Sequence, residues 1–297
     1  MKKIFISGGT LFQSMIYMKN FPQPKPQTAF SKKFAETIGG TGTGKALNLN
    51  KLDFDLTLHA LVGNDTYGDK ILSTFKEQNL NFIYDIDPKG TERHINIMND
   101  IGERISIYVN YATFEPEIDL SKFEPIIANT DYLVLNIINY CRNLIPFAKK
   151  HQKEIWCDIH DYDGKNQYHI DFIESASYIF MSSDNLPDYK GFMEKLIQDG
   201  KKLVVCTHGK DGSTALTNTG KWIETPIIEE YNNRKVDTNG AGDSFFAGVL
   251  YGHSKGYDIE KCLKMGTIVS GLCVTSQDFV SKDLSPEYIE NEYKKYY

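Results

Sequence analysis

Short apolar runs alternate with helical repeats over most of the chain, and this rhythm predicts the fold class. Because strand–helix–strand units place helices on both faces of a parallel sheet, it indicates an α/β fold with a doubly wound, mainly parallel sheet flanked by helices. In the C-terminal two thirds, strands are expected at 132–138, 155–159, 178–181 and 203–207, and helices at 144–151, 192–198, 257–276 and 286–297.

The N-terminal part follows the same rhythm. Strands are expected at 3–6 and 56–62, and the apolar positions between 46 and 52 have helical spacing. Asp65 follows the second of these strands and is expected to cap a helix that covers about 70–78. This part therefore contributes further strand–helix units to the same sheet.

A β-hairpin is expected at 93–98 and 104–111, because alternating apolar positions flank a turn that contains a glycine. The segment 21–27 contains three prolines and predicts a loop, and 29–38 predicts an extended strand. These segments lie outside the strand–helix rhythm, so they indicate a small additional sheet or an ordinary edge hairpin.

Ligands of parallel α/β sheets bind beyond the carboxyl ends of the strands, so polar residues at those ends are the first candidates for a site. His160 has no second histidine at ligand spacing, which makes a substrate contact from Asp158 or His160 a better interpretation than a zinc site. The polar and glycine positions at the predicted strand ends are Asn136, Asn139, Asp158, His160, Ser182, Asn185, Thr207 and Gly209.

The composition excludes several classes of protein but does not identify a function. Of the 297 residues, 41% are hydrophobic and 24% are charged, which is ordinary for a soluble globular protein. The formal net charge of −6 and the lack of basic runs argue against a nucleic-acid partner. No apolar stretch approaches membrane-spanning length, the N-terminus has no signal-peptide pattern, and the five cysteines lack C-x-x-C spacing, so we expect a cytoplasmic protein with reduced cysteines.

The stretch 235–251 carries the strongest chemical signal. It reads as a strand, a tight turn with Gly240 and Gly242, and the start of an apolar helix at Phe245. The first N–H groups of a helix lack partners within the helix, and the helix dipole adds partial positive charge there. Since glycine lets a ligand approach the backbone closely, the sequence predicts an anion site at this turn.

Asp243 is an acidic residue inside this predicted anion site. A carboxylate placed where a phosphate would bind suits a general base that takes a proton from an attacking hydroxyl. The alternative is a glycine-rich turn without chemistry, in which Asp237 or Asn239 caps the helix.

Residues 237–243, Asp-Thr-Asn-Gly-Ala-Gly-Asp, resemble the D-T-x-G-A-G-D signature of the ribokinase-like (PfkB-type) carbohydrate kinases. The resemblance implies one ribokinase-like domain over 1–297 that phosphorylates a sugar hydroxyl with ATP and Mg²⁺. It implies that Asp243 is the base and that the N–H groups of Gly240, Ala241 and Gly242 stabilise the transferred phosphoryl group. In some members a monovalent cation such as K⁺ lies near the loop that here contains Asp237.

Three further blocks resemble the family in the same order along the chain. Gly39-Gly40 matches the turn that opens the sugar-binding helix, and 63–68 matches a G-x-D-x-x-G block that we interpret as a helix cap. Thr207, Gly209 and Gly212 match a T-x-G-x-x-G block that lies along the nucleotide. A P-loop interpretation of 39–45 fails, because the lysine is followed by alanine instead of serine or threonine.

The chain departs from the family at residues that grip the sugar. Gln13 stands where an aspartate is usual, and Gly44 stands where an asparagine is usual. The N-x-x-E pair is also incomplete, since the matching positions are Ser182 and Asn185, or Asn185 and Asp188, so the metal ligands stay unassigned. The implied sugar-binding residues are Gln13, Gly39, Gly40, Asn136 and Asp243, and the implied nucleotide-binding residues are Ser182, Asn185, Thr207, Gly209, Gly212 and Asp237.

In the family, strands that correspond to about 10–37 and 91–112 form a small lid sheet over the substrate, and this lid is a common dimer surface. The first hypothesis is a kinase for a free sugar. The second is a nucleoside kinase, favoured by the departures at Gln13 and Gly44. The third is a non-catalytic sugar- or nucleotide-binding protein, against which the intact 240–243 turn argues.

Overall fold

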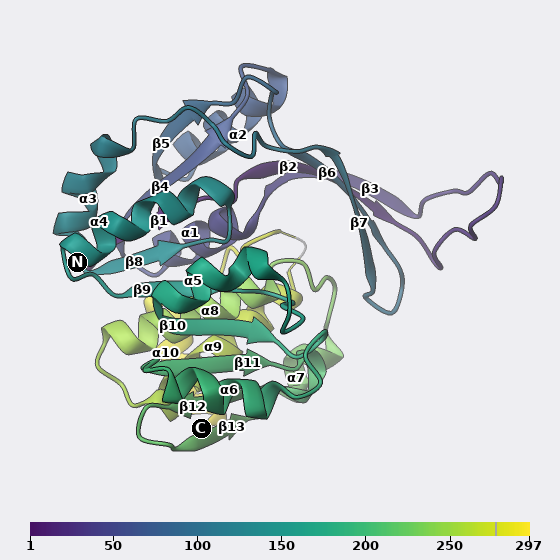
Figure 1. Ribbon diagram of the computed structural model, residues 1–297. Coiled ribbons are helices and arrows are strands. Elements are labelled where there is room, and N and C mark those ends of the chain that lie inside the picture. Colours follow the sequence, from purple (N-terminus) through teal and green to yellow (C-terminus); the bar gives the residue numbers. More distant parts are fainter. Residues whose placement is uncertain (277) are drawn as a thin grey trace.

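Two β-sheets organise the computed structural model, which describes residues 1–276 and 278–297 (Figure 1). The large sheet has the strand order β13-β12-β11-β10-β9-β8-β1-β4-β5, and all neighbours are parallel except β11–β12 and β12–β13. Its strands are β1 (Lys3–Ser7), β4 (Asp55–Val62), β5 (Asn81–Ile86), β8 (Tyr132–Leu135), β9 (Ile155–Asp158), β10 (Ala176–Ser182), β11 (Leu203–Thr207), β12 (Ser213–Thr217) and β13 (Trp222–Thr225).

Helices cover both faces of the large sheet, and each face has its own apolar core. The expected doubly wound α/β fold is therefore confirmed. One core includes residues of α1 (Thr41–Lys51), α2 (Thr66–Glu77), α7 (Glu229–Asn233), α8 (Ala241–Ser254), α9 (Ile259–Val274) and α10 (Pro286–Tyr296). The other includes residues of α3 (Glu124–Asn129), α4 (Ile145–Lys150), α5 (Ile170–Ser175) and α6 (Tyr189–Gln198).

The strand order reverses beside β1, and this reversal positions the site. The chain runs from β1 outward to β4 and β5, and then returns to β8 on the other side of β1. A crevice opens at such a switch point because the flanking connections leave in opposite directions. The segments that follow β1 and β8 therefore border a crevice at the carboxyl edge of the sheet.

Helices α8 and α9 pack backbone against backbone. A Cβ atom on Gly248 would lie 2.6 Å from the carbonyl oxygen of Met265 and 2.8 Å from the Cα of Gly266. No side chain larger than hydrogen fits at that crossing. The two helices are therefore held at a short separation along the wall that borders the crevice.

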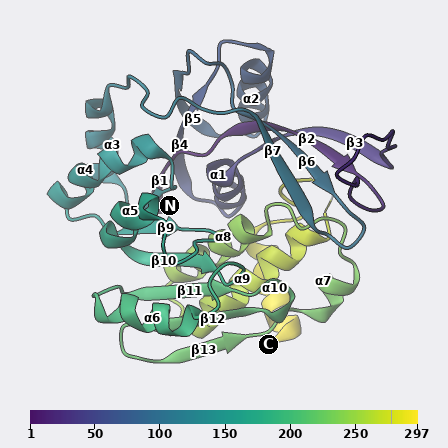
Figure 2. The same cartoon turned by 45° about the vertical axis from the view of Figure 1, so that its right-hand side comes forward.

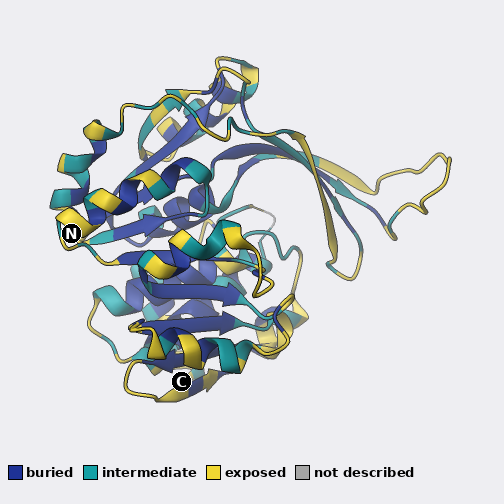
Figure 3. Cartoon of the chain, viewed as in Figure 1, coloured by how far each residue is buried: buried dark blue, intermediate teal, exposed yellow. Residues whose placement is uncertain are grey.

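The small sheet has the order β3-β2-β6-β7, in which β2 and β6 are parallel and the outer pairs are antiparallel. Figures 1 and 2 show it projecting from the large-sheet body, with the β6–β7 turn reaching toward the C-terminal half. Figure 3 shows that the large-sheet strands are mostly buried, whereas the far end of the small sheet is exposed. Its strands are β2 (Leu11–Tyr17), β3 (Lys33–Gly39), β6 (Arg93–Met98) and β7 (Arg104–Asn110).

The two faces of the small sheet differ in character. Registered neighbours in a sheet share a face. Gln13, Asn96 and Tyr17 belong to the face toward the body, since Tyr17 contacts the loop before α8. The opposite face carries apolar side chains, which include Ile16, Phe34, Ile95, Ile97, Ile105 and Ile107.

Several expectations from the sequence need correction. The strand expected before α8 is wrong: the N–H groups of Val236 and Asp237 donate to the carbonyl of Val274, so this segment crosses the end of α9 without joining a sheet. The strand expected at 132–138 ends at Leu135, and the helix expected to begin near residue 70 begins at Thr66. Asp65 caps that helix as expected, accepting from the N–H groups at 67 and 68.

All five cysteines are buried free thiols, as expected. Within residues 1–276 and 278–297, no helix combines the length and the apolar character needed to cross a bilayer.

Candidate active site

The N-terminus of α8 lines a cavity and has no side-chain cap. Gly240 is the N-cap residue, with a left-handed backbone (φ 82°) that glycine adopts without strain. Asp237 and Asn239 do not cap the helix, because Asp237 accepts from the N–H of Asn239 and Asn239 accepts from Arg104. The N–H of Ala241 donates to the carbonyl of Thr238, and Gly242 is exposed at the helix start. This end of the helix has the geometry of an anion site.

A cavity of about 440 Å³ lies in front of this helix end. Three of the residues matched to a nucleotide-binding block, Thr207, Gly209 and Gly212, line it together with Ala241 and Gly242. Helix α9 lines the cavity through Thr267, Ser270, Gly271 and Val274, and α7 through Tyr231 and Asn232. Elements far apart in sequence thus form one pocket, and its lining includes the predicted anion site.

The other nucleotide candidates lie elsewhere. The side-chain amide of Asn185 donates to the carbonyl and carboxylate of Asp161, and the hydroxyl of Ser182 accepts from the N–H of Asp184. Neither lines the cavity, whereas Asp184 does. Among the described residues that line the cavity, Asp184 is acidic, and Lys210 and Lys235 are basic.

Asp243 lies in the first turn of α8 and is part of a buried charge cluster. Its Oδ1 atom is 2.6 Å from Nζ of Lys45, which is 3.2 Å from Oδ2 of Asp158. The Asp243 side chain is 11% exposed and that of Lys45 is fully buried. His160 Nδ1 lies 3.5 Å from the same Asp158 oxygen. The cluster joins α1, the end of β9 and α8.

Burial raises the pKa of Asp243 above its ordinary value, against the opposing effect of the Lys45 charge. Burial alone would lower the pKa of Lys45, but the charges of Asp243 and Asp158 outweigh it, so Lys45 stays protonated. For Asp158, burial is outweighed by His160 and Lys45, which lower its pKa. A carboxylate with a raised pKa suits a proton acceptor near neutral pH.

Gln13 and the Gly39-Gly40 turn lie together, as the resemblance implies. A Cβ atom on Gly39 would meet the Gln13 amide at 2.7 Å, so the two are in contact. The Oε1 atom of Gln13 accepts from Asn96, while its buried Nε2 atom has no partner. Gly40 is the N-cap of α1. This corner presents an unsatisfied amide donor beside the turn.

Asn136 serves the backbone at the switch point. Its amide nitrogen donates to the carbonyls of Ser7 and Gly8, which ties the end of β8 to the end of β1. Its Oδ1 atom is buried without a partner. The amide group therefore fixes the crevice geometry and still offers one acceptor.

Asp237 connects the α8 turn to the small sheet. Its Oδ2 atom accepts from the hydroxyl of Tyr17 at 2.5 Å. Arg104 of β7 donates to Asn239 at 2.9 Å, and Gly102 of the β6–β7 turn lines the cavity in front of α8. The small sheet thus reaches both the turn and the cavity.

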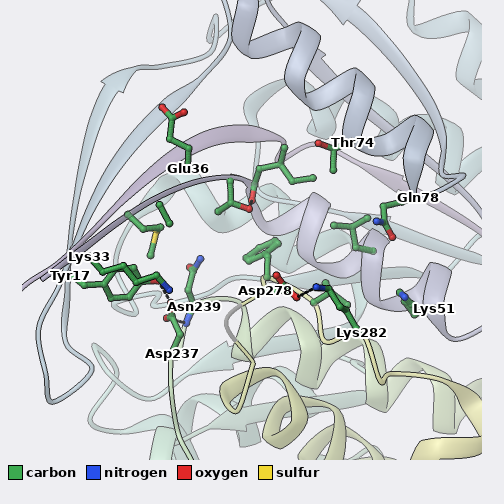
Figure 4. A pocket seen from close by; sticks show the side chains of 17 residues that line it. Tyr17, Lys33, Glu36, Lys51, Thr74, Gln78, Asp237, Asn239, Asp278 and Lys282 are labelled. Carbon is green, nitrogen blue, oxygen red and sulfur yellow. Dashed lines mark hydrogen bonds and ion pairs between the residues drawn. The ribbon is translucent and has the colours of Figure 1, made fainter.

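A second cavity of about 440 Å³ lies on the other side of this loop. Figure 4 shows Tyr17 and Asp237 at one end of it, and Lys51 and Gln78 at the other. Asp278 and Lys282, which form an ion pair, also line it. Asp237 lines this second cavity and is absent from the lining of the cavity in front of α8.

Within residues 1–276 and 278–297, no three His, Cys, Asp or Glu side chains gather as a metal-binding group. A divalent ion that accompanies a nucleotide needs fewer protein ligands, since Mg²⁺ often binds through one or two carboxylates together with phosphate oxygens and water. Asp184 fits that requirement.

Sequence reasoning missed Lys45 and Asp184. In the sequence, Lys45 belongs only to the rejected P-loop pattern, although a lysine beside the apolar positions of α1 is itself a signal that it is buried and needs a partner. Asp184 lies between Ser182 and Asn185, at a position that the N-x-x-E block leaves unspecified.

Comparison with known proteins identifies the family of this chain. The family model described as pfkB family carbohydrate kinase matches residues 1–283. Acarbose 7(IV)-phosphotransferase of Actinoplanes sp. is 26% identical over 279 residues, which are 92% of each protein. The nucleoside kinase of Methanocaldococcus jannaschii is 25% identical over 305 residues, covering 93% of this chain and 92% of the relative.

Solved structures share the fold. The microbiome-derived acarbose kinase Mak1 superposes with a TM-score of 0.88 at 24% identity, covering 98% of both chains. Ribokinase of Arabidopsis thaliana, solved with ribose and ATP, has a TM-score of 0.80 at 18% identity and covers 98% of both chains. The large sheet with its small companion sheet is therefore common to all three.

Proposed function

Because the chain belongs to the pfkB family of carbohydrate kinases, we propose that it transfers the terminal phosphoryl group of ATP to a sugar hydroxyl, with Asp243 as the general base. The observation that carries the assignment is the place of Asp243. Its carboxylate lies in the first turn of an uncapped helix, which also borders a nucleotide-sized cavity. The base and the anion site therefore lie on adjoining residues.

The chain supplies charge stabilisation through α8. A developing negative charge at the transferred phosphoryl group is stabilised by backbone N–H groups that are already oriented toward it. Gly242 at the exposed helix start is the best placed donor, because the N–H of Ala241 also serves the turn. Gly240 shapes the turn through its left-handed backbone.

We assign the cavity in front of α8 to ATP, with Thr207, Gly209 and Gly212 along the phosphates. Lys210 and Lys235 add positive charge to the lining. Asp184 would face the divalent ion, which we take to be Mg²⁺ and which neutralises phosphate charge when bound.

The fit for a monovalent cation such as K⁺ rests on the loop at Asp237. Both carboxylate oxygens of Asp237 already accept hydrogen bonds, one from the N–H of Asn239 and one from Tyr17. Each of these oxygens keeps a second lone pair, so the Asp237 carboxylate could also contact a monovalent cation. Activity measured with K⁺ or Na⁺ as the only monovalent cation tests this point.

The acceptor is assigned to the corner formed by Gln13, Gly39, Gly40 and Asn136, beneath the small sheet. The buried Gln13 amide and the Asn136 carbonyl lack partners, and hydroxyl groups would satisfy both. These are sugar-type contacts, so we favour a sugar acceptor over a nucleoside. Closure of the small sheet would exclude water, which competes for the phosphoryl group.

The apolar outer face of the small sheet favours a homodimer. Phe34 is 58% exposed, Ile105 41% and Ile107 46%, and these side chains share one face. Apolar groups in such a row are stabilised by burial against an identical face. We further propose that the protein works in the cytoplasm, where its buried thiols stay reduced and ATP is available.

The deciding experiment measures ADP release across a panel of acceptors. The panel contains free hexoses and pentoses, acarbose, 5-dehydro-2-deoxygluconate and nucleosides, with acceptor-free ATP as the blank. We expect turnover with a sugar or sugar-like acceptor. Turnover with nucleosides alone would replace the sugar assignment, and binding without turnover by any acceptor would favour a binding protein.

Asp243→Asn tests the base within that assay. Removal of a general base typically lowers kcat by about 10²–10⁴-fold. The amide keeps the size of the side chain, so ADP affinity should be retained. An Asn variant with near wild-type turnover on the identified acceptor would remove Asp243 from the mechanism.

A further inference from the structure

Lys45 is a buried cation whose two partners are both carboxylates of the crevice. Its side chain is 0% exposed, with Nζ 2.6 Å from Asp243 and 3.2 Å from Asp158. It also lies over the ring of Phe246, 5.1 Å from its centroid. A lysine is rarely buried to this degree without a specific charge partner.

The glycine before it belongs to the same arrangement. A Cβ atom at Gly44 would lie 2.5 Å from Oδ2 of Asp243 and 2.8 Å from its Cβ. Any side chain at position 44 would therefore displace the Asp243 carboxylate. Residues 44 and 45 therefore act together on Asp243. Gly44 leaves space for the carboxylate, and Lys45 binds the carboxylate in that space.

From this geometry we infer that Lys45 is a positioning residue for the base: it binds Oδ1 of Asp243 so that Oδ2 is left for the acceptor hydroxyl, while Asp158 holds Lys45 from the other side. The inference rests on the proposed role of Asp243. Lys45 is too deeply buried to reach the acceptor itself, so it acts only through the carboxylate.

Two physical effects follow from the contact. A charged hydrogen bond fixes the carboxylate in one rotamer, which preserves the approach of Oδ2 to the hydroxyl. The positive charge also favours the ionised form of Asp243, in opposition to burial, and the Asp158 charge acts in the reverse direction. Lys45 should therefore lower the pKa of Asp243, whereas Asp158 should raise it.

The groups that face Asp243 come from four elements. Lys45 lies on α1, Asp158 at the end of β9 and His160 just beyond it. Cys273 of α9 is the fourth; burial raises the pKa of its thiol to about 11, so it stays neutral. Lys45 and Asp158 are the charges whose removal gives the clearest opposite shifts.

The test compares Lys45→Met and Asp158→Asn by the pH profile of kcat/KM, with Lys76→Met on α2 as a matched lysine control. Lys45→Met should move the acidic limb to higher pH by at least about one unit, so that at pH values below both limbs kcat/KM falls roughly tenfold relative to the wild type. Asp158→Asn should move the limb to lower pH. ADP affinity should stay at the wild-type value in both variants.

A purely structural role for Lys45 would lower the yield or thermal stability without moving the limb. If Lys45→Met folds, as judged by ADP binding, and keeps the wild-type profile, the inference is wrong. If it does not fold, Asp158→Asn decides: a limb that stays in place or moves to higher pH overturns the inference.

This outcome is separable from the proposed function. Full turnover by Asp243→Asn would end the base assignment, whatever Lys45 does. If Asp243→Asn is inactive and Lys45→Met keeps the wild-type pH profile, Asp243 remains the proposed base but Lys45 is not its positioning residue.

Discussion

The hydroxyl of Tyr17 donates to the carboxylate of Asp237 at 2.5 Å, although the two residues are 220 positions apart. Tyr17 ends β2 of the small sheet, and Asp237 begins the turn that leads into α8. The hydrogen bond therefore connects the proposed lid with the proposed phosphate site. Since Asp237 also accepts from the N–H of Asn239, the same carboxylate shapes the turn.

Tyr17→Phe should weaken the closed arrangement of the small sheet while leaving both sheets folded. A hydrogen bond to a charged group contributes about 1.5–3 kcal/mol, so we expect the KM for the acceptor to rise about tenfold or more. Acceptor-independent ATP hydrolysis should also rise, because water enters more often. Steady-state kinetics and ADP release without acceptor measure the two effects.

Tyr111→Phe is the matched control, because this tyrosine follows β7 and is 63% exposed. It should behave as the wild type. Unchanged acceptor KM and unchanged hydrolysis in Tyr17→Phe would show that the contact does not govern closure.

A bulky side chain in the cavity in front of α8 should compete with ATP. Ser270 lines that cavity from α9, so Ser270→Trp is expected to raise the Kd for ADP by at least about tenfold, since an overfilled site loses its ligand contacts. Calorimetric titration with ADP measures this. Ser73→Trp, on the exposed face of α2, should bind ADP normally. Equal affinity in both variants would place the nucleotide elsewhere.

Stability should fall as the pH is lowered from 7 to 4, and His59 is one cause. The ring is fully buried, 2.9 Å from Asp85, and burial lowers its pKa to about 4. The unfolded chain protonates this histidine near pH 6.5, so its contribution is complete above that pH and is lost as the pH falls toward 4. The loss amounts to roughly 3 kcal/mol of unfolding free energy.

Asp85 does not offset this effect. Burial would raise its pKa, but hydrogen bonds from Lys122 and His59 outweigh burial and lower it, so Asp85 stays ionised through the window. Urea unfolding at pH 7, 6, 5 and 4 should show a shallower pH dependence for His59→Gln than for His151→Gln, which changes a partly exposed histidine. Parallel curves for the two variants would exclude His59 as the cause.

The outer face of the small sheet should hold the proposed dimer together. Ile107→Lys places a charge on that face, in the edge strand β7, and should shift the protein to a monomer in light scattering after gel filtration. Ile86→Lys changes an isoleucine that is 53% exposed at the end of β5, outside the small sheet, and should leave the mass unchanged. A wild-type protein that is already monomeric at micromolar concentration would contradict the proposal.

The sequence predicts the large sheet well because each strand there is a local apolar run between helical repeats. Leu203–Thr207 is found at the expected residues. The strand expected before α8 fails for a non-local reason: its N–H groups pair with Val274, almost forty residues away. Apolar character alone cannot show which partner a backbone will take.

Prediction of the site follows the same division. Asp243 and the block at Thr207–Gly212 lie in short motifs; Thr207, Gly209 and Gly212 line one cavity with Ala241 and Gly242, which directly precede Asp243. Lys45 and Asp184 have no motif, because their roles depend on which side chains the fold places opposite them. Ser182 and Asn185 match an incomplete block, and their side-chain hydrogen bonds go to Asp184 and Asp161.

The bare backbone contact between Gly248 and Gly266 has a mechanical consequence. Because no side chain separates the two helices at this crossing, we expect α8 and α9 to move together. Helix α9, which lines the proposed ATP pocket, and the N-terminus of α8, which we assign to the phosphates, would then behave as one rigid unit. A displacement of α9 by a bound nucleotide would therefore also displace the first turn of α8, which contains Asp243.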